Sequence, residues 1–209
     1  MTEHRGAKAR ARILESGLKL FHLKGIQATS VDEILEDSGT GKSQFYHYFK
    51  NKDGLVHSVL SHFYQRLKSG QGSLETNIKT WEDLESWFGF FVNFQKAVGC
   101  RMSCPIGTIG NDLTADQELL RQDVRLIFDF IRHRLIEFFA TLKGQGKIPS
   151  SVKPEELADF CICIMQGGLL VGKIRREVEP FENSVAHALS YLKGLDTRPD
   201  QRKAKRIAR

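Results

Sequence analysis

The chain has 209 residues, of which 41% are hydrophobic and 27% charged, and its net charge is +6. This length suits one large domain or two modest ones, and the composition is typical of a soluble globular protein. We find no run of about 18 apolar residues and no apolar core behind the basic N-terminus, so we expect neither a membrane span nor a signal peptide. Four cysteines in a chain of this size do not resemble a secreted disulfide framework, so we predict a cytoplasmic protein with reduced thiols. The positive charge favours a polyanionic partner without deciding the fold.

The first predicted helix runs from about Gly6 to Lys24, because apolar residues recur there at helical spacing. Its stripe consists of Ile13, Leu14, Gly17, Leu18 and Phe21. Gly25 is expected to end the helix as a left-handed cap, with Ile26 packing back against it.

Two short helices are predicted next. The earlier one starts at Thr29 or Ser30, and Ser30 with Glu33 has the spacing of a capping box. The sequence Ser-Gly-Thr-Gly at 38–41 breaks it, and a second short helix follows from Lys42 to Phe49. Two short helices joined by a tight glycine-containing turn are typical of a helix-turn-helix.

The rest of the chain also predicts helices and no strands. Helices are expected from residues 51–54 onward and over Trp81–Val98, Asp116–Leu142, Pro154 to about Val178, and Phe181–Leu195, whereas residues 99–114 are expected to be irregular. We therefore predict an all-α fold of about nine helices. It divides into a DNA-binding head (1–52), a ligand-binding and dimerisation body (53–196) and a basic, disordered tail (197–209), and the loop at 70–73 is a further plausible boundary between head and body.

The chemistry of the Lys42–Phe49 helix suits DNA. Its N-terminal end carries three side chains with hydrogen-bond donors, Lys42, Ser43 and Gln44. Such an end enters the major groove, where Gln favours adenine and Lys favours guanine. Contacts to phosphates are expected from Thr29, Ser30, Tyr46, Tyr48 and Lys52. The alternative is a capped helical hairpin with a solvated polar face. A phosphate-binding loop at GTGKS is disfavoured, because Glu36 stands where the first glycine belongs and the preceding segment is helical.

These residues resemble the head of the tetracycline repressor (TetR) family over a long, gapless stretch. The matching positions are Thr29, Ser30, Val31, Ile34, Gly39, Lys42, Ser43, Phe45, Tyr46, Tyr48–Lys52 and Leu55. The departures are mild and lie in the turn, at Ser38, Thr40 and Gly41. The resemblance implies an all-helical homodimer whose two heads bind a pseudo-palindromic operator, with a ligand in the body altering their spacing. By the family pattern, DNA contacts fall on Thr29, Ser30, Lys42, Ser43, Gln44, Tyr46, Tyr48 and Lys52.

The last two predicted helices suit dimerisation. Both are amphipathic, and two such helices from each chain make a four-helix bundle. The candidate interface residues are Cys161, Met165, Gly168, Gly172, Val185 and Leu189. TetR-type proteins dimerise through their last two helices, so the resemblance agrees. The alternative is that both helices close the core of a single chain.

The molecule or modification that the body senses is predicted less sharply than the DNA contacts. The aromatic stripe that includes Trp87 and Phe91 either lines a ligand pocket or is plain core. Cys100 and Cys104 flank Arg101, and an arginine and a nearby helix N-terminus would lower a thiol pKa, which suggests an electrophile or oxidant sensor. The alternatives are two small buried side chains, or a zinc site with Cys161 and Cys163 that fits no usual spacing.

One subgroup resemblance bears on these cysteines. The segments KSQFYHYFKNK, Gly99-Cys100 and KIRREVEPFENSVAHAL are similar to the N-ethylmaleimide reductase repressor subgroup, in which a cysteine at the position of Cys100 reacts with electrophiles. We therefore predict a DNA-binding regulator, most simply a homodimeric repressor released by a small molecule or by cysteine modification. The alternative is a helical ligand-binding or enzyme module. No nucleophile–base pair or metal cluster supports an enzyme, so we predict no catalytic residues, no metal and no cofactor.

Overall fold

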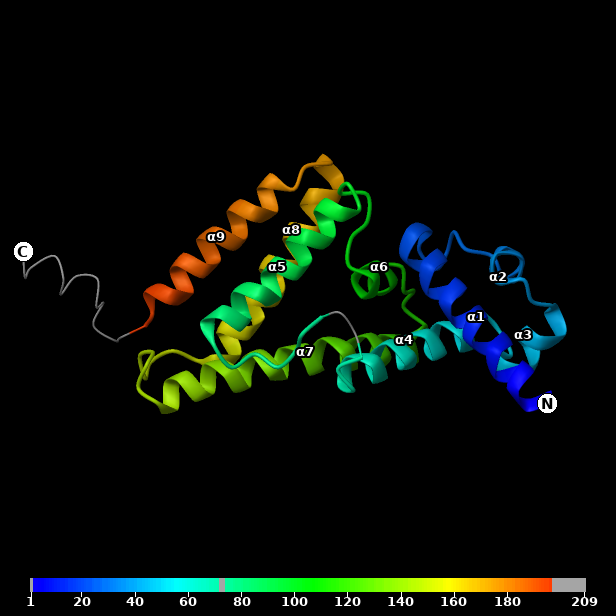
Figure 1. Cartoon of the computed structure of the whole chain (residues 1–209), viewed down its shortest axis with the longest axis horizontal. Helices are drawn as coiled ribbons and strands as arrows, with labels where there is room; N and C mark the ends of the chain where they lie inside the picture. The colour runs from blue at the N-terminus through cyan, green and yellow to red at the C-terminus, as the bar shows by residue number, and fades with distance from the viewer. Residues whose placement is uncertain (1, 72–73, 197–209) are drawn as a thin grey trace, which may run out of the picture.

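A computed structural model describes residues 2–71 and 74–196 of the chain (Figure 1). Within these ranges the chain forms nine α-helices and no strand, which confirms the predicted fold class. The helices are α1 (Thr2–Lys24), α2 (Val31–Ser38), α3 (Lys42–Phe49), α4 (Lys52–Lys68), α5 (Trp81–Ala97), α6 (Pro105–Asn111), α7 (Glu118–Gly144), α8 (Pro154–Arg175) and α9 (Glu179–Gly194). The tail predicted to be disordered lies outside the described residues.

The head is built from α1, α2 and α3, with the start of α4 packed against them (Figure 1). Its caps are those the sequence predicts. Gly25 has the left-handed φ of +83°, which a β-carbon would strain, and the fully buried Ile26 follows it. Ser30 Oγ accepts from Glu33 N at 3.2 Å while the Glu33 carboxylate accepts from Ser30 N at 2.9 Å, so the capping box is complete.

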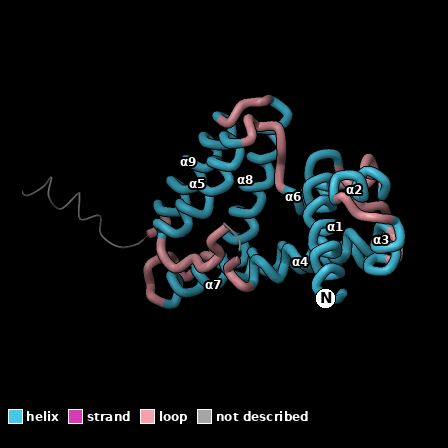
Figure 2. The backbone as a smooth tube through the Cα atoms, turned by 45° about the vertical axis from the view of Figure 1, so that its right-hand side comes forward, coloured by secondary structure: helices cyan, strands magenta, loops and turns pink. Residues whose placement is uncertain are grey.

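The body is a bundle in which α8 packs against α7, α9 and α5. Figure 1 shows α7 running from the body back along α4, so these two helices join the two ends of the molecule. Figure 2 shows α6 between the head and the body. Apolar side chains from both parts form one continuous core.

Two expectations about helix boundaries were wrong. Residues 99–114 are not wholly irregular, because Pro105–Asn111 forms α6, with Cys104 as its N-cap and the proline in its first turn. The sequence did not predict this short helix because it contains glycines and a proline, although proline is well suited to the first turn of a helix. The last helix was expected to begin at Phe181, but α9 begins at Glu179 and includes Pro180 in its first turn.

One helix bears on the membrane expectation, which stays a prediction. Helix α8 is long and apolar enough to cross a membrane by length and composition alone, with a mean hydropathy of 1.6 in its best window. Core helices pass the same test, and α8 packs on three other helices. Its composition is explained by an inner face in the core together with an apolar outer face described below.

Candidate DNA interface and ligand cavity

Helix α3, the predicted recognition helix, has one face buried in the head and the other exposed to solvent. Phe45 and Phe49 are buried and anchor it in the core of the head. Lys42, Ser43 and Gln44 are exposed at its N-terminal end, and the Tyr46 side chain is 53% exposed. Gln44 Oε1 accepts from Gly41 N at 3.4 Å, but Gly41 has no side chain that could accept from the first N–H groups of α3, so these remain available to a phosphate.

Lys42 is held in place from the neighbouring helix. Its Nζ lies 3.0 Å from Asp32 Oδ1 on α2, and this hydrogen bond raises the pKa of Lys42. Both side chains are largely exposed, so the pair adds little stability. It does present a lysine that is charged at every physiological pH and aimed away from the core.

Three of the predicted DNA contacts are buried or half-buried, namely Thr29, Lys52 and Tyr48. Thr29 is buried, at 1% exposure, and its hydroxyl donates to Gly25 O at 2.7 Å, so this side chain does not face a partner. Lys52 donates to Ile26 O at 3.0 Å and Thr29 O at 3.3 Å, which ties α4 to the turn after α1. Tyr48 is half-buried and packs against the core.

Lys50 is a candidate that the sequence argument missed. It is exposed at the end of α3 with φ +63° and ψ −46°, and Asn51 N donates to Phe49 O at 2.7 Å across it. These angles and this contact define a γ-turn of the strained, positive-φ kind. A lysine held there costs backbone energy, and such strain gathers at functional sites.

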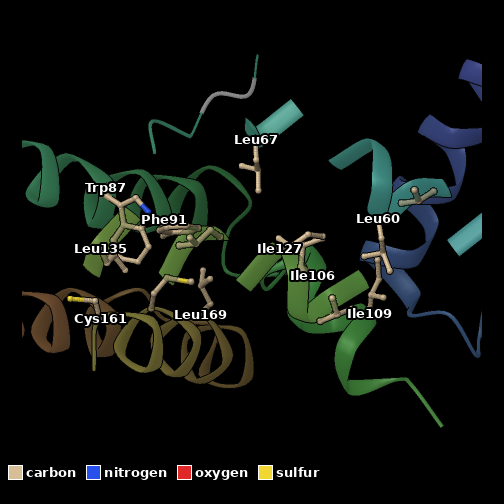
Figure 3. Packing of buried hydrophobic residues seen from close by; sticks show 14 of the residues in the cluster. Leu60, Leu67, Trp87, Phe91, Ile106, Ile109, Ile127, Leu135, Cys161 and Leu169 are labelled. Atoms are coloured by element: carbon tan, nitrogen blue, oxygen red, sulfur yellow. The ribbon is translucent and has the colours of Figure 1, made fainter. Parts of the chain in front are cut away.

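The body contains an apolar cavity of about 300 Å³. This is near the lower end of the range of small-molecule pockets, roughly 300–1,000 Å³. Figure 3 shows Phe91, Ile106 and Leu169, which come from α5, α6 and α8 and are part of its wall. The wall consists of Leu18, His22, His62, Phe63, Arg66, Leu67, Leu74, Phe90, Phe91, Phe94, Cys104, Pro105, Ile106, Ile127, Phe128, Ile131, Met165, Gln166 and Leu169.

The cavity wall includes the head itself, through Leu18 and His22 of α1. His22 Nε2 lies 2.6 Å from Ser103 O, just before α6, and its ring stacks on Phe94 with centroids 6.0 Å apart. At the far end of α6, Gln27 N and its side-chain amide donate to Asp112 at 3.3 Å. The head therefore contacts the chain at both ends of α6 and also forms part of the cavity wall.

The predicted sensor residues separate in space. Phe91 lines the cavity, whereas Trp87 is 2% exposed in the core and does not. Cys104 lines it, but burial raises the pKa of this thiol, so the predicted lowering was wrong for Cys104. Cys100 is 5% exposed and lies beyond the C-terminal end of α5, outside the cavity wall.

The zinc alternative finds no geometric support. Burial raises the pKa of Cys161 to about 12, which disfavours the thiolate that binds metal. Among the described residues, no three His, Cys, Asp or Glu side chains gather closely enough to hold a metal ion.

The residues predicted to form the dimer interface face the wrong way. Cys161, Met165, Gly168, Gly172 and Val185 are buried inside the chain, and Leu189 is half-buried. Gly168 gives room to its own chain, because a β-carbon there would lie 1.9 Å from Phe181 Cδ2. The opposite face of α8 carries exposed apolar side chains at Leu170, Val171 and Ile174, and Tyr191 is exposed on α9. The predicted interface residues therefore belong mostly to the core of a single chain, and dimerisation through α8 and α9 stays a prediction.

Comparison with known proteins identifies the family to which the chain belongs. The family described as "Bacterial regulatory proteins, tetR family" matches residues 13–59, which contain α2 and α3. The family described as "Tetracyclin repressor-like, C-terminal domain" matches residues 81–188, about half of the chain. The chain belongs to the TetR family. It is a transcriptional regulator with a helix-turn-helix head.

Several TetR-family proteins are similar over most of their length. The HTH-type transcriptional repressor DhaR of Mycobacterium sp. (strain GP1) is 26% identical over 179 residues, covering 83% of this chain and 86% of that protein. The HTH-type transcriptional repressor NemR of Escherichia coli (strain K12) is 24% identical over 208 residues, covering 92% and 98%.

Solved structures share the fold. The reduced form of E. coli NemR superposes with a TM-score of 0.70 at 22% identity, covering 91% of this chain and 98% of that chain. A TetR regulatory protein from Rhodobacter sphaeroides superposes with a TM-score of 0.76 at 21% identity, covering 87% and 97%.

Proposed function

We propose that this TetR-family protein is a homodimeric repressor that leaves its operator when a small molecule fills the cavity of the body. The observation that carries the proposal is the cavity wall itself, which includes Leu18 and His22 from the DNA-binding head. Family membership supports DNA binding, and two similar proteins are named repressors. Such a protein works in the cytoplasm, where the DNA lies.

The DNA contacts we propose follow exposure. Lys42, Ser43 and Gln44 read the major groove, Ser30 and Tyr46 contact the backbone, and the strained Lys50 joins them. Lys52 and Tyr48 contribute less, since Lys52 spends two of its three donors inside the protein and Tyr48 is half-buried. Thr29 acts indirectly by fixing the turn after α1.

Dimerisation is proposed through the outer face of α8 and α9. Leu170, Val171, Ile174 and Tyr191 give this face exposed apolar area. Surfaces of this kind mark protein interfaces when they are contiguous. A dimer is also required by the chemistry of DNA recognition, because one short recognition helix contacts few base pairs, and two half-sites about 34–36 Å apart multiply the specificity.

Release is proposed to work through α6. Because the head holds α6 at both ends, a ligand that pushes Ile106 or Phe94 also pushes α1 through His22. Rotation of the two heads then changes the distance between their recognition helices.

We prefer reversible binding of a ligand in the cavity over alkylation of a cysteine, because Cys100 is buried and burial raises the pKa of Cys104. A Cys100→Ser variant that no longer responds to N-ethylmaleimide, while the parent protein does, would reverse this preference.

The test is DNA binding by the double variant Lys42→Ala, Gln44→Ala, measured on the DNA upstream of the gene by fluorescence anisotropy at several salt concentrations. We expect at least a hundredfold loss of affinity and a shallower salt dependence, since one phosphate- or base-contacting charge is gone from each head. The matched control is Lys68→Ala with Gln65→Ala, on the exposed side of α4. Equal affinity of the double variant and the parent protein would refute the proposed interface.

A further inference from the structure

The cavity has a mixed character that defines the chemistry of its ligand. Its interior is aliphatic and aromatic, with five phenylalanines among the lining residues, namely Phe63, Phe90, Phe91, Phe94 and Phe128. No aspartate or glutamate belongs to the lining among the described residues, so a cationic ligand would find no counter-charge there.

The mouth of the cavity is cationic. Of the described lining residues, two are exposed, and these are His62 and Arg66, four residues apart on α4. They stand at the boundary between the apolar interior and water. A molecule in the cavity can therefore contact a guanidinium and an imidazole from α4 as well as the phenylalanine rings of the wall.

Arg66 differs from the other arginines of the body helices. The arginines of α7 and α8 all pair with carboxylates, at Arg121–Glu118, Arg125–Asp129, Arg132–Asp159, Arg134–Glu137 and Arg175–Glu177. The Arg66 guanidinium has no ion pair or hydrogen bond in the described part of the chain. An unpaired guanidinium offers a planar fork of donors that matches a carboxylate.

We propose that the cavity binds a small apolar monocarboxylic acid, with its hydrocarbon or aromatic body among the phenylalanines and its carboxylate on Arg66, assisted by His62. The size of the cavity limits the acid to a compact molecule. The proposal deepens the proposed function and rests on it only for the effect of the ligand on DNA. Binding itself does not require the head to contact DNA.

The test compares three probes of one shape: 4-phenylbutyrate, its primary amide and the corresponding amine, 4-phenylbutylamine. Calorimetric titration of the full-length protein measures each affinity at pH 7.5. We expect the acid to bind at least tenfold more tightly than the amide, and the amine to bind most weakly. In Arg66→Gln the preference for acid over amide should fall below threefold, while the affinity for the amide stays unchanged. Because Arg66 is exposed and unpaired, this variant should unfold at the temperature of the parent protein.

The matched control is Lys68→Gln, which removes one positive charge from the same helix outside the cavity wall. It should keep the tenfold preference. The proposal is overturned if the amide binds as tightly as the acid, if the preference survives in Arg66→Gln, or if none of the three probes binds. Because these titrations contain no DNA, a failure of operator binding would refute the proposed function and leave the ligand class standing.

Discussion

The head and the body of this protein differ in how far apart in the sequence their hydrogen-bonded residues lie. In the head, much of the geometry is fixed by contacts between close neighbours, such as the box between Ser30 and Glu33 and the Asn51 cap that accepts from Gly54 N at 2.8 Å. In the body, the buried amide of Gln95 donates to Leu169 O at 2.8 Å across 74 residues. Local contacts therefore define the helix caps of the head, whereas contacts between distant parts of the chain define the packing around the cavity.

The largest effect we expect concerns the outer face of the body. Ile174→Glu would bury an unpaired carboxylate in the proposed interface, at a cost of several kcal/mol, and should raise the dimer dissociation constant by more than about a hundredfold. Light scattering coupled to gel filtration measures this. The control is Leu119→Glu, since Leu119 is equally exposed (77% against 72% for Ile174) but lies at the start of α7. A dimer that persists in Ile174→Glu would show that the two chains meet elsewhere.

The next effect tests the long-range packing of the body. Gly168→Ala places a methyl group where the Phe181 ring already lies, so we expect a loss of about 1–3 kcal/mol in the free energy of unfolding. Gly89→Ala, in the middle of α5 with nothing within 4 Å, should instead stabilise by about 1 kcal/mol. Urea denaturation measures both. Equal effects at the two positions would mean that α9 moves away from α8 at little energetic cost.

The packing around these glycines is an example of what the sequence did not predict. Helix periodicity predicted α8 and α9 and their apolar character, and the local caps of the head were predicted almost residue by residue. Periodicity cannot say which of two apolar stripes on α8 faces inward, because both are rich in apolar residues, and so the predicted dimer residues fall on the stripe that packs inside the chain. The cavity depends on five helices and on α1 of the head, and no local pattern in Leu18, His62 or Arg66 indicates that these residues meet.

A smaller effect tests whether the head is controlled locally. Ser30→Ala removes a capping hydroxyl and should cost about 1 kcal/mol of stability. Gly41→Ser, at a cap with nothing within 4 Å of the added carbon, should gain a few tenths of a kcal/mol. Thermal unfolding measures both, and operator affinity shows whether tighter capping of α3 changes DNA binding. If Ser30→Ala leaves the stability unchanged, the head depends on its core more than on its caps.

The smallest effect lies at His22, where head and body meet. Burial lowers the pKa of His22 below its usual 6.5, and the nearby Lys173 lowers it further, while the hydrogen bond to Ser103 O partly opposes both. Above pH 6.5 the ring is neutral in both the folded and the unfolded chain, so its contribution to stability is fully present. As the pH falls through 6.5 toward the folded pKa, the unfolded chain takes up the proton first, and stability is lost.

His22→Gln keeps an N–H donor for Ser103 O but cannot titrate, so its unfolding free energy should fall less between pH 7 and pH 5 than that of the parent protein. His47→Gln, exposed on α3, is the matched control and should follow the parent protein. Urea denaturation at each pH measures the slopes. Arg66 lines the same cavity and Lys173 lowers the pKa of His22, so the proton on His22 adds to a region that is already positive. If His22→Gln shows the slope of the parent protein, the acid sensitivity arises outside this contact, and the head and body are coupled by packing rather than by charge.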